Sequence, residues 1–244
     1  MPMILFARSQ PDTPGKLTAH AFSYEHMEEA AYELLSRVAE RAGDPETAAV
    51  ARAIRDEERA MSDRLASSFD LAVAASLAAR GSDDLPEQLD AYLADVHALE
   101  QQAIQLLQSG SKLTEADELA SVFSEHLEET RGHARRIDGR LDARDASTST
   151  LKDAAMRLGG LNYGGLLGAQ PDTPAKLAGF AFAFEYLEIA AYELLKRVAR
   201  HLGDAGSVEL ADSILADERA MAERIATHWD EAVDAALRSQ GLTV

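Results

Sequence analysis

The sequence predicts an all-α protein, and three observations lead to that expectation. Ala, Leu, Glu, Arg and Asp dominate the composition, whereas glycine and proline are few and lie at the edges of segments. Apolar residues recur with the helical period along most of the chain. No segment has the alternating pattern of a β-strand. We therefore expect helices joined by short turns.

One segment of the chain occurs twice, 160 residues apart. Residues 24–38 read YEHMEEAAYELLSRV, and residues 184–198 read FEYLEIAAYELLKRV. The correspondence continues without a gap from Gln10 and Gln170 to Leu77 and Leu237, with about half of the positions identical. The sequence thus predicts a duplicated helical hairpin on both sides of a different middle piece, residues 83–145. We expect an N-terminal hairpin in residues 1–82 and a four-helix unit in residues 83–244.

Caps and helix breakers place six main helices. Thr13-Pro14 and Thr173-Pro174 each read as an N-cap followed by proline at the first helical position. Gly43 and Gly203 are the expected stops of these two helices. The stretch 151–169, which contains LGGLNYGGLLGAQ, is predicted to connect the fourth and fifth helices across the bundle, and a lid is the alternative. The six helices are expected at about 13–42, 46–79, 86–109, 115–143, 173–202 and 206–239.

Charge and cysteine content restrict the function. The chain has 24 basic and 42 acidic residues, a net charge of −18, which disfavours nucleic acid and anionic membrane surfaces as partners and suits cations. There is no run of 18 apolar residues to span a membrane, and the N-terminus lacks a signal-peptide pattern. The absence of cysteine excludes disulfides, thiol catalysis and cysteine-based metal sites. We expect a cytoplasmic protein.

Each of the last four predicted helices carries a carboxylate on the stripe that should be buried. These residues are Glu100, Glu129, Glu188 and Glu218, and His126 and His133 share the stripe of Glu129. Burying an unpaired carboxylate costs several kcal/mol, so the four should be protonated, paired with arginine or bound to cations. Inward carboxylates with histidine are how a four-helix bundle builds a two-metal site. Such ligands suit iron or manganese, and they also admit zinc.

The alternative is a helical scaffold without catalysis, in which the metal site is vestigial and holds no cofactor. Arginines near the carboxylates could then neutralise them by ion pairing. Tyr192 and Tyr32 are expected to be core aromatics with a hydrogen bond, and support of a metal site is a second interpretation. The candidate arginines are Arg131, Arg135, Arg136, Arg219 and Arg224.

Four segments carry a resemblance to a known family: DVHALEQQ (95–102), HLEETRGHARRID (126–138), FEYLEIAAYELL (184–195) and LADERA (215–220). Residues 85–240 resemble the ferritin-like bacterial stress proteins of the YciE/YciF type, a domain of unknown function. The resemblance implies an antiparallel ferritin-like four-helix bundle with a di-iron carboxylate centre, a redox or stress-response role, and a homodimer or higher homo-oligomer. The metal ligands that it implies are Glu100, His126, Glu129, Glu185, Glu188 and Glu218.

The chain departs from that family pattern at several positions. The family often has a Glu-His motif where this chain has Glu185-Tyr186, and the N-terminal copy keeps the motif at Glu25-His26. Gly132 and Met221 stand three residues after Glu129 and Glu218, so neither Glu-x-x-His pair is intact. The N-terminal copy forms a candidate second site from Glu25, His26, Glu28 and Glu58.

The apolar face of the N-terminal hairpin must be covered, and two arrangements remain open. Two hairpins from two subunits could complete a bundle across a two-fold axis, or the hairpin could pack on the bundle of its own chain. Whether the protein catalyses a reaction also stays open. The face in question contains Phe22, Leu34, Leu35, Val38, Ile54, Leu65 and Phe69.

Overall fold

The computed structural model describes residues 13–78, 84–113, 117–146 and 172–242. Within these ranges all regular structure is helical, which confirms the all-α prediction. The predicted connection at 151–169 lies outside the described residues. The helices are α2 (Thr13–Arg41), α3 (Pro45–Ala66), α4 (Phe69–Ala78), α5 (Leu85–Leu113), α6 (Asp117–Asp142), α9 (Thr173–Leu202), α10 (Ala205–Ala226) and α11 (Trp229–Ser239).

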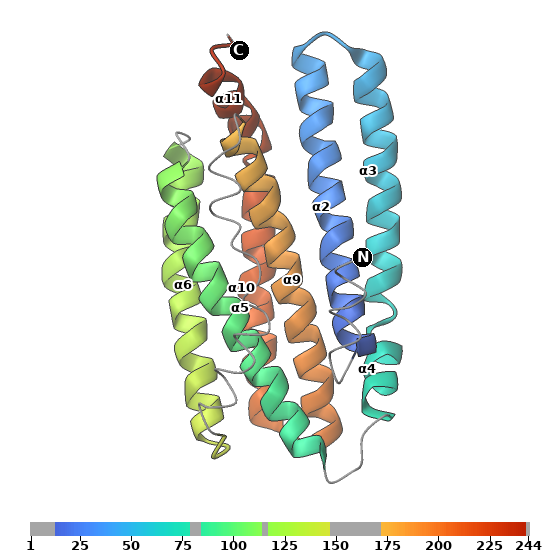
Figure 1. Cartoon of the computed structure of the whole chain (residues 1–244), viewed down its shortest axis with the longest axis vertical. Helices are drawn as coiled ribbons and strands as arrows, with labels where there is room; N and C mark the ends of the chain where they lie inside the picture. Colours follow the sequence, from blue (N-terminus) through green and yellow to red (C-terminus); the bar gives the residue numbers. More distant parts are fainter. Residues whose placement is uncertain (1–12, 79–83, 114–116, 147–171, 243–244) are drawn as a thin grey trace.

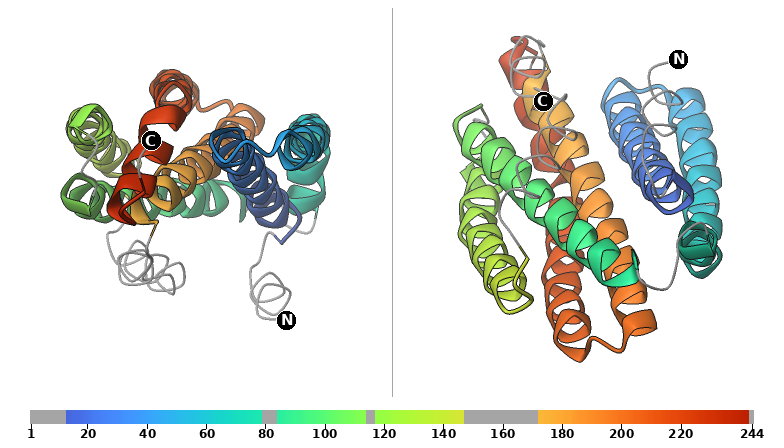
Figure 2. Two further views of the ribbon diagram at one scale, coloured as in Figure 1. Left: turned by 90° about the horizontal axis from the view of Figure 1, so that it is seen from above. Right: turned by 60° about the horizontal axis from the view of Figure 1, so that its bottom comes forward.

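Three helical pairs lie side by side (Figures 1 and 2). Helices α5, α6, α10 and α9 contact one another in a closed ring, as the members of a four-helix bundle do. The N-terminal pair, α2 and α3, lies on the other side of α9, and α2 contacts α9 directly. The hairpin therefore packs on the bundle of its own chain.

Helix α9 is the centre of the molecule because both of its sides are covered. It contacts α5 and α10 within the bundle and α2, α4 and α11 outside it. Its sequence is apolar nearly all round, and residues on opposite sides, such as Ala178 and Val198, are both fully buried. Small residues allow the close approach of α2, since an added Cβ on Gly179 would lie 3.3 Å from Leu34 and 3.7 Å from Ala30.

The helix stops at Gly43 and Gly203 are confirmed. Both glycines have left-handed backbone angles, with φ of +70° and +66°. Asp44 and Asp204 then cap the next helices by accepting the backbone N–H of Thr47 at 3.0 Å and of Ser207 at 2.8 Å. The prediction that Thr173 is an N-cap was wrong by one residue, because Asp172 holds that position and Thr173 is already helical.

Two predicted helices are each divided in two, at the same point of the repeat. The expected helix 46–79 breaks at Ser67-Ser68, and the expected helix 206–239 breaks at Thr227-His228. Polar side chains there bond to carbonyls of the preceding turn: Ser68 Oγ donates to Leu65 O at 2.7 Å, and Thr227 Oγ1 donates to Arg224 O at 2.7 Å. No described helix is long and apolar enough to cross a membrane.

Candidate metal centre

The four bundle helices bring six ionisable side chains into one buried cluster. Their positions on the apolar stripes turn them inward, and every one is at most 2% exposed. Helix α5 supplies one glutamate, α6 two histidines, α9 two glutamates and α10 one glutamate. We call these residues the buried centre: Glu100, His126, His133, Glu185, Glu188 and Glu218.

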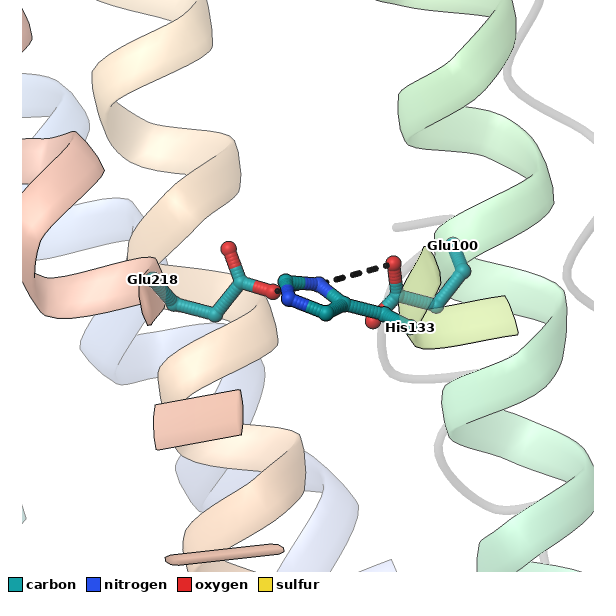
Figure 3. A group of neighbouring side chains, drawn as sticks. All are labelled: Glu100, His133 and Glu218. Carbon is teal, nitrogen blue, oxygen red and sulfur yellow. Dashed lines mark ion pairs between the residues drawn. The ribbon is translucent and has the colours of Figure 1, made fainter. Parts of the chain in front are cut away.

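One half of the buried centre consists of Glu100, His133 and Glu218. His133 Nδ1 lies 2.9 Å from Glu218 Oε1 and 3.5 Å from Glu100 Oε2. Figure 3 shows the imidazole between the two carboxylates. One potential ligand atom from each residue lies within 4.8 Å of the others, a spacing that a single metal ion can bridge.

The other half consists of His126, Glu185 and Glu218. His126 Nε2 lies 3.2 Å from Glu185 Oε2 and 3.4 Å from Glu218 Oε2. These three residues again offer ligand atoms within 4.8 Å of one another. Glu218 thus belongs to both halves through its two oxygens, which is the arrangement of a carboxylate that bridges two metal ions.

Eight buried atoms of this cluster have no directed hydrogen bond to any described group. They include both oxygens of Glu188 and both oxygens of Glu218. Buried polar atoms are normally hydrogen-bonded, so a cluster whose atoms contact only one another at 2.9–3.5 Å, or in Glu188 no described group, needs a ligand or bound protons. Nitrogen and carboxylate oxygen atoms that converge in this way fit iron, manganese or zinc. The remaining four atoms are Glu100 Oε2, His126 Nε2, His133 Nδ1 and Glu185 Oε2.

Electrostatics in the metal-free centre favour charged imidazoles. Burial alone would lower the pKa of His126, but Glu185 and Glu218 outweigh it and raise that pKa to about 12. Burial likewise opposes protonation of His133, and Glu100 and Glu218 raise its pKa to about 10. Burial would raise the pKa of Glu218, but the two histidines outweigh this effect and lower it to about 2.

The other carboxyls of the centre tend to hold protons when no metal is present. Burial raises the pKa of Glu188 well above its usual range, and the charges of Glu218 and Glu100 add to the effect. Burial also raises the pKa of Glu100, and it raises that of Glu185 to about 7. The metal-free centre therefore stores protons that a metal ion would displace.

Outer contacts hold both imidazoles by the nitrogen that faces away from the cluster. Glu129 Oε2 lies 3.0 Å from His126 Nδ1, and Asp217 Oδ2 lies 3.2 Å from His133 Nε2. Both carboxylates are about half exposed, at 48% and 45%. A carboxylate on the far nitrogen is the usual means of fixing the tautomer and orientation of a metal-binding histidine.

The structure thus brings five of the six residues that the sequence singled out into the buried centre, and it places Glu129 outside. Glu129 lies on the edge of the α6 stripe, where its carboxylate reaches solvent and contacts His126 from behind. His133 belongs to the centre, although the ligand set implied by the resemblance omitted it. The signal was its position seven residues after His126, two turns along the same stripe.

Three of the five arginines considered as partners of the buried carboxylates pair closely with other residues. Arg219 pairs with Glu193 at 2.5 Å, Arg224 pairs with Glu125 at 2.7 Å, and Arg131 pairs with the exposed Glu128. No ion pair among the described residues joins an arginine to a glutamate of the buried centre.

The N-terminal copy brings together three of its four candidate ligands. Glu25, Glu28 and Glu58 offer ligand atoms within 4.8 Å of one another, and all three are half-buried. Burial and the nearby Glu58 raise the pKa of Glu25 and of Glu28. His26 lies apart from them, because its Nδ1 contacts Glu29 at 3.0 Å and its ring stacks on Tyr186.

Comparison with known proteins gives a family and a fold. A family model described as a domain of unknown function (DUF892) matches residues 12–78 and 84–238. Protein YciF of Escherichia coli strain K12 is 29% identical over 138 residues, which cover 52% of this chain and 80% of that protein.

Two crystal structures have a similar fold. A protein from Xanthomonas campestris pv. campestris superposes with a TM-score of 0.53 at 26% identity, over 65% of this chain and 99% of that one. The Escherichia coli stress protein YciF superposes with a TM-score of 0.51 at 22% identity, over 65% of this chain and 98% of that one. The expected ferritin-like bundle is therefore confirmed as a fold.

Proposed function

The chain belongs to the DUF892 family, a domain of unknown function, and we propose from the geometry of its site that it binds two metal ions in the buried centre. The observation that carries the proposal is the convergence, from four helices, of eight buried nitrogen and oxygen atoms that contact only one another or, in Glu188, have no partner among the described residues. We propose iron first, with manganese or zinc as alternatives, because the set combines four carboxylates with two imidazoles.

Each half of the buried centre would hold one ion. Glu100 and His133 would bind the first, His126 and Glu185 the second, and Glu218 would bridge both because it belongs to both ligand groups. The unpaired Glu188, whose pKa responds to Glu218, Glu100 and Glu185, would complete the set. A bound pair of iron ions would supply reversible one-electron chemistry towards dioxygen or a peroxide.

The residues of the chain itself would exclude water and fix the ligands. The core of the bundle surrounds the centre, so each ligand is withdrawn from bulk solvent. Tyr192, 1% exposed, donates its hydroxyl to Glu100 Oε1. Glu129 and Asp217 orient the two imidazoles. A ferritin-like oxidoreductase or iron-handling protein is the function that this arrangement supports best.

A helical scaffold with a vestigial site is the second candidate, and one observation favours it. Burial raises the pKa of Glu188 and Glu100, so neutral carboxyls could remain in the core without any metal. The metal content separates the two candidates. Under the scaffold hypothesis, metal ions would change neither the composition nor the thermal stability of the purified protein.

The decisive experiment is elemental analysis of the tag-free protein by mass spectrometry, before and after anaerobic loading with Fe²⁺ and desalting. About two retained ions per chain are expected for a two-metal centre. About three or four would indicate that residues outside the buried centre, such as Glu25, Glu28 and Glu58, also bind metal. Retention of less than about a tenth of an ion per chain after loading would reject the proposal in favour of the scaffold.

A homodimer belongs to the same proposal. The side chains of Tyr24 and Leu35 on the α2–α3 pair are 48% and 44% exposed. Their counterparts in the repeat, Phe184 and Leu195, are buried in the bundle at 6% and 0%. We propose that the hairpin of a second copy covers these exposed side chains. Light scattering after size exclusion at micromolar protein should give twice the chain mass, and the mass of a single chain would reject the dimer.

A stress-related role is proposed by analogy to the stress protein YciF.

A further inference from the structure

A further cluster of potential metal-ligating side chains lies at one end of the bundle, apart from both the buried centre and the N-terminal group of Glu25, Glu28 and Glu58. It joins Glu118 in the first turn of α6 to His228 and Glu231, which lie at the start of α11. One potential ligand atom of each lies within 4.8 Å of the others. Eight residues separate Glu118 from His126 along α6, about 12 Å of helix, so the cluster is distinct from the buried centre.

The imidazole of His228 is already oriented for a ligand. Its Nδ1 lies 2.7 Å from the carbonyl oxygen of Arg224 and 3.1 Å from Thr227 Oγ1. Nδ1 therefore carries the hydrogen and donates to the carbonyl, which leaves the lone pair on Nε2. A backbone carbonyl on one ring nitrogen is a usual partner of a histidine that binds metal through the other.

The carboxylate of Glu231 is held by one oxygen only. Its Oε1 accepts the backbone N–H of Glu118 at 3.1 Å and that of Leu119 at 3.4 Å, at the start of α6. Its Oε2 is buried and has no directed hydrogen bond to any described group. Glu231 Oε1 therefore already neutralises the partial positive charge at the N-terminus of α6, and Glu231 Oε2 remains available to bind a cation.

The spacing leaves room for an ion between the imidazole and the two carboxylates. All three ligand atoms lie within 4.8 Å of one another. In the described part of the chain, however, no nitrogen–oxygen ion pair within 4.0 Å involves Glu118, His228 or Glu231, whereas the nearby Arg224 pairs with Glu125. Around a tetrahedral zinc ion with bonds of about 2.0–2.2 Å the ligand atoms lie about 3.3–3.5 Å apart, a separation that the three side chains reach by small rotations.

We propose that Glu118, His228 and Glu231 bind one Zn²⁺ ion that ties the start of α6 to the junction of α10 and α11. One imidazole and two carboxylates suit zinc, and the exposed position of Glu118 leaves the remaining coordination to water. The N-terminal copy lacks the site, because Ser68 and Leu71 stand where this half has His228 and Glu231. The role is structural, since the ion would join elements that adjoin the bundle end.

The test is a Zn²⁺ titration of the metal-free full-length protein against a chromophoric zinc chelator, with far-UV circular dichroism to verify folding. Glu118→Gln and His228→Asn should each remove about one equivalent of bound Zn²⁺, or weaken it at least about tenfold. His201→Ala, which removes an exposed imidazole elsewhere, should bind as much zinc as the unmodified protein.

The result does not depend on the buried centre. If that centre binds no metal, the unmodified protein still takes up one equivalent of Zn²⁺, and Glu118→Gln abolishes it. Because Glu118 is exposed, its replacement leaves the fold intact and gives a clear reading even if His228→Asn unfolds the end of α10. Unchanged zinc content and affinity in Glu118→Gln would overturn the proposal.

Discussion

His26 and Tyr186 stack face to face, with ring centroids 3.3 Å apart and an interplanar angle of 15°. The two residues occupy the same position of the internal repeat, 160 residues apart. Ser23 Oγ donates to the carbonyl oxygen of Ala183 at 2.7 Å, again between equivalent positions. Contact between equivalent positions is the mark of two-fold symmetry, so the two copies meet as the halves of an internal pseudo-dimer.

The close contact between α2 and α9 predicts that a larger side chain in their interface destabilises the protein. Gly179→Leu should destabilise the protein by about 1–3 kcal/mol, because even an added Cβ would lie 3.3 Å from Leu34 and a larger side chain would force the helices apart. Gly139→Leu on α6 is the control, since nothing lies within 4 Å of its added Cβ. Urea denaturation measures both. Equal stability of the two variants would mean that α2 does not pack on α9 in solution.

The buried, unpaired Glu188 predicts opposite effects on stability and on metal binding. Glu188→Met should leave the metal-free protein unchanged or stabilise it by about 1–2 kcal/mol, because it removes a carboxyl that no described group satisfies. The same change should reduce retained iron and abolish the rise in melting temperature on loading. Calorimetry and elemental analysis provide the two readouts.

The matched control for Glu188 is Glu28, which occupies the same position in the N-terminal copy. Glu28→Met should leave the metal content of the buried centre intact, because that residue is on the other side of the molecule, on α2. Strong destabilisation of metal-free Glu188→Met would show that the Glu188 carboxyl has a stabilising partner in the folded protein, and the prediction would then be wrong.

The sequence was sufficient for the helices and for most of the buried centre. A carboxylate on a 3.6-residue stripe is visible in the sequence alone, and so are caps such as Gly43-Asp44. For a residue at the edge of an apolar stripe, however, the sequence does not show whether the side chain faces the core or the solvent. Glu129 therefore turned out to support His126 from outside, while His133 entered the centre. Periodicity also passes through Ser67-Ser68, where local hydrogen bonds to carbonyls end α3.

The apolar pattern of the sequence could not show whether the N-terminal hairpin packs on its own chain or on a second one. Helix α9 is apolar on both sides, which predicts two neighbours, but a helix of the same chain and a helix of a second chain satisfy that pattern equally. Only the folded structure shows that α2 is one of them.

Tyr192 predicts a difference between affinity and stability. Tyr192→Phe removes the hydroxyl that donates to Glu100, which should reduce metal affinity by about 10–100-fold. The loss of stability should be only about 1 kcal/mol. Competition with a metal chelator measures the affinity. Tyr32→Phe, at the equivalent position of the other copy, is the control and should change neither quantity. Unchanged affinity in Tyr192→Phe would mean that Glu100 is not a ligand or does not need this support.

The buried histidines predict that the metal-free protein loses stability as the pH rises. The pKa of His133 in the folded protein is raised from 6.5 to about 10, and that of His126 from 6.5 to about 12. Their stabilising contribution is complete below pH 6.5 and is lost as the pH rises towards those folded values. The pKa of Glu185, raised from 4.5 to about 7, acts in the same direction between these two values.

The folded state therefore binds more protons than the unfolded state throughout this range. Its free energy of unfolding should fall by an amount on the order of 1 kcal/mol per pH unit between about pH 6 and about pH 9. Urea midpoints of protein kept in chelator at several pH values measure the slope. Replacing His133 with glutamine should make the slope smaller, because one of the two titrating imidazoles is then absent.

Metal binding should reverse this dependence on pH. Ligands must be deprotonated to bind a metal ion, so loading the centre displaces the protons held by His126, His133 and Glu188, and affinity rises with pH. The gap between the urea midpoints of loaded and metal-free protein should consequently widen from about pH 6 to about pH 8. Calorimetry in buffers of different ionisation enthalpy should detect the released protons. A gap that stays constant, with no proton release, would mean that the metal binds outside the buried centre, because it is the buried centre that holds protons which a cation must displace.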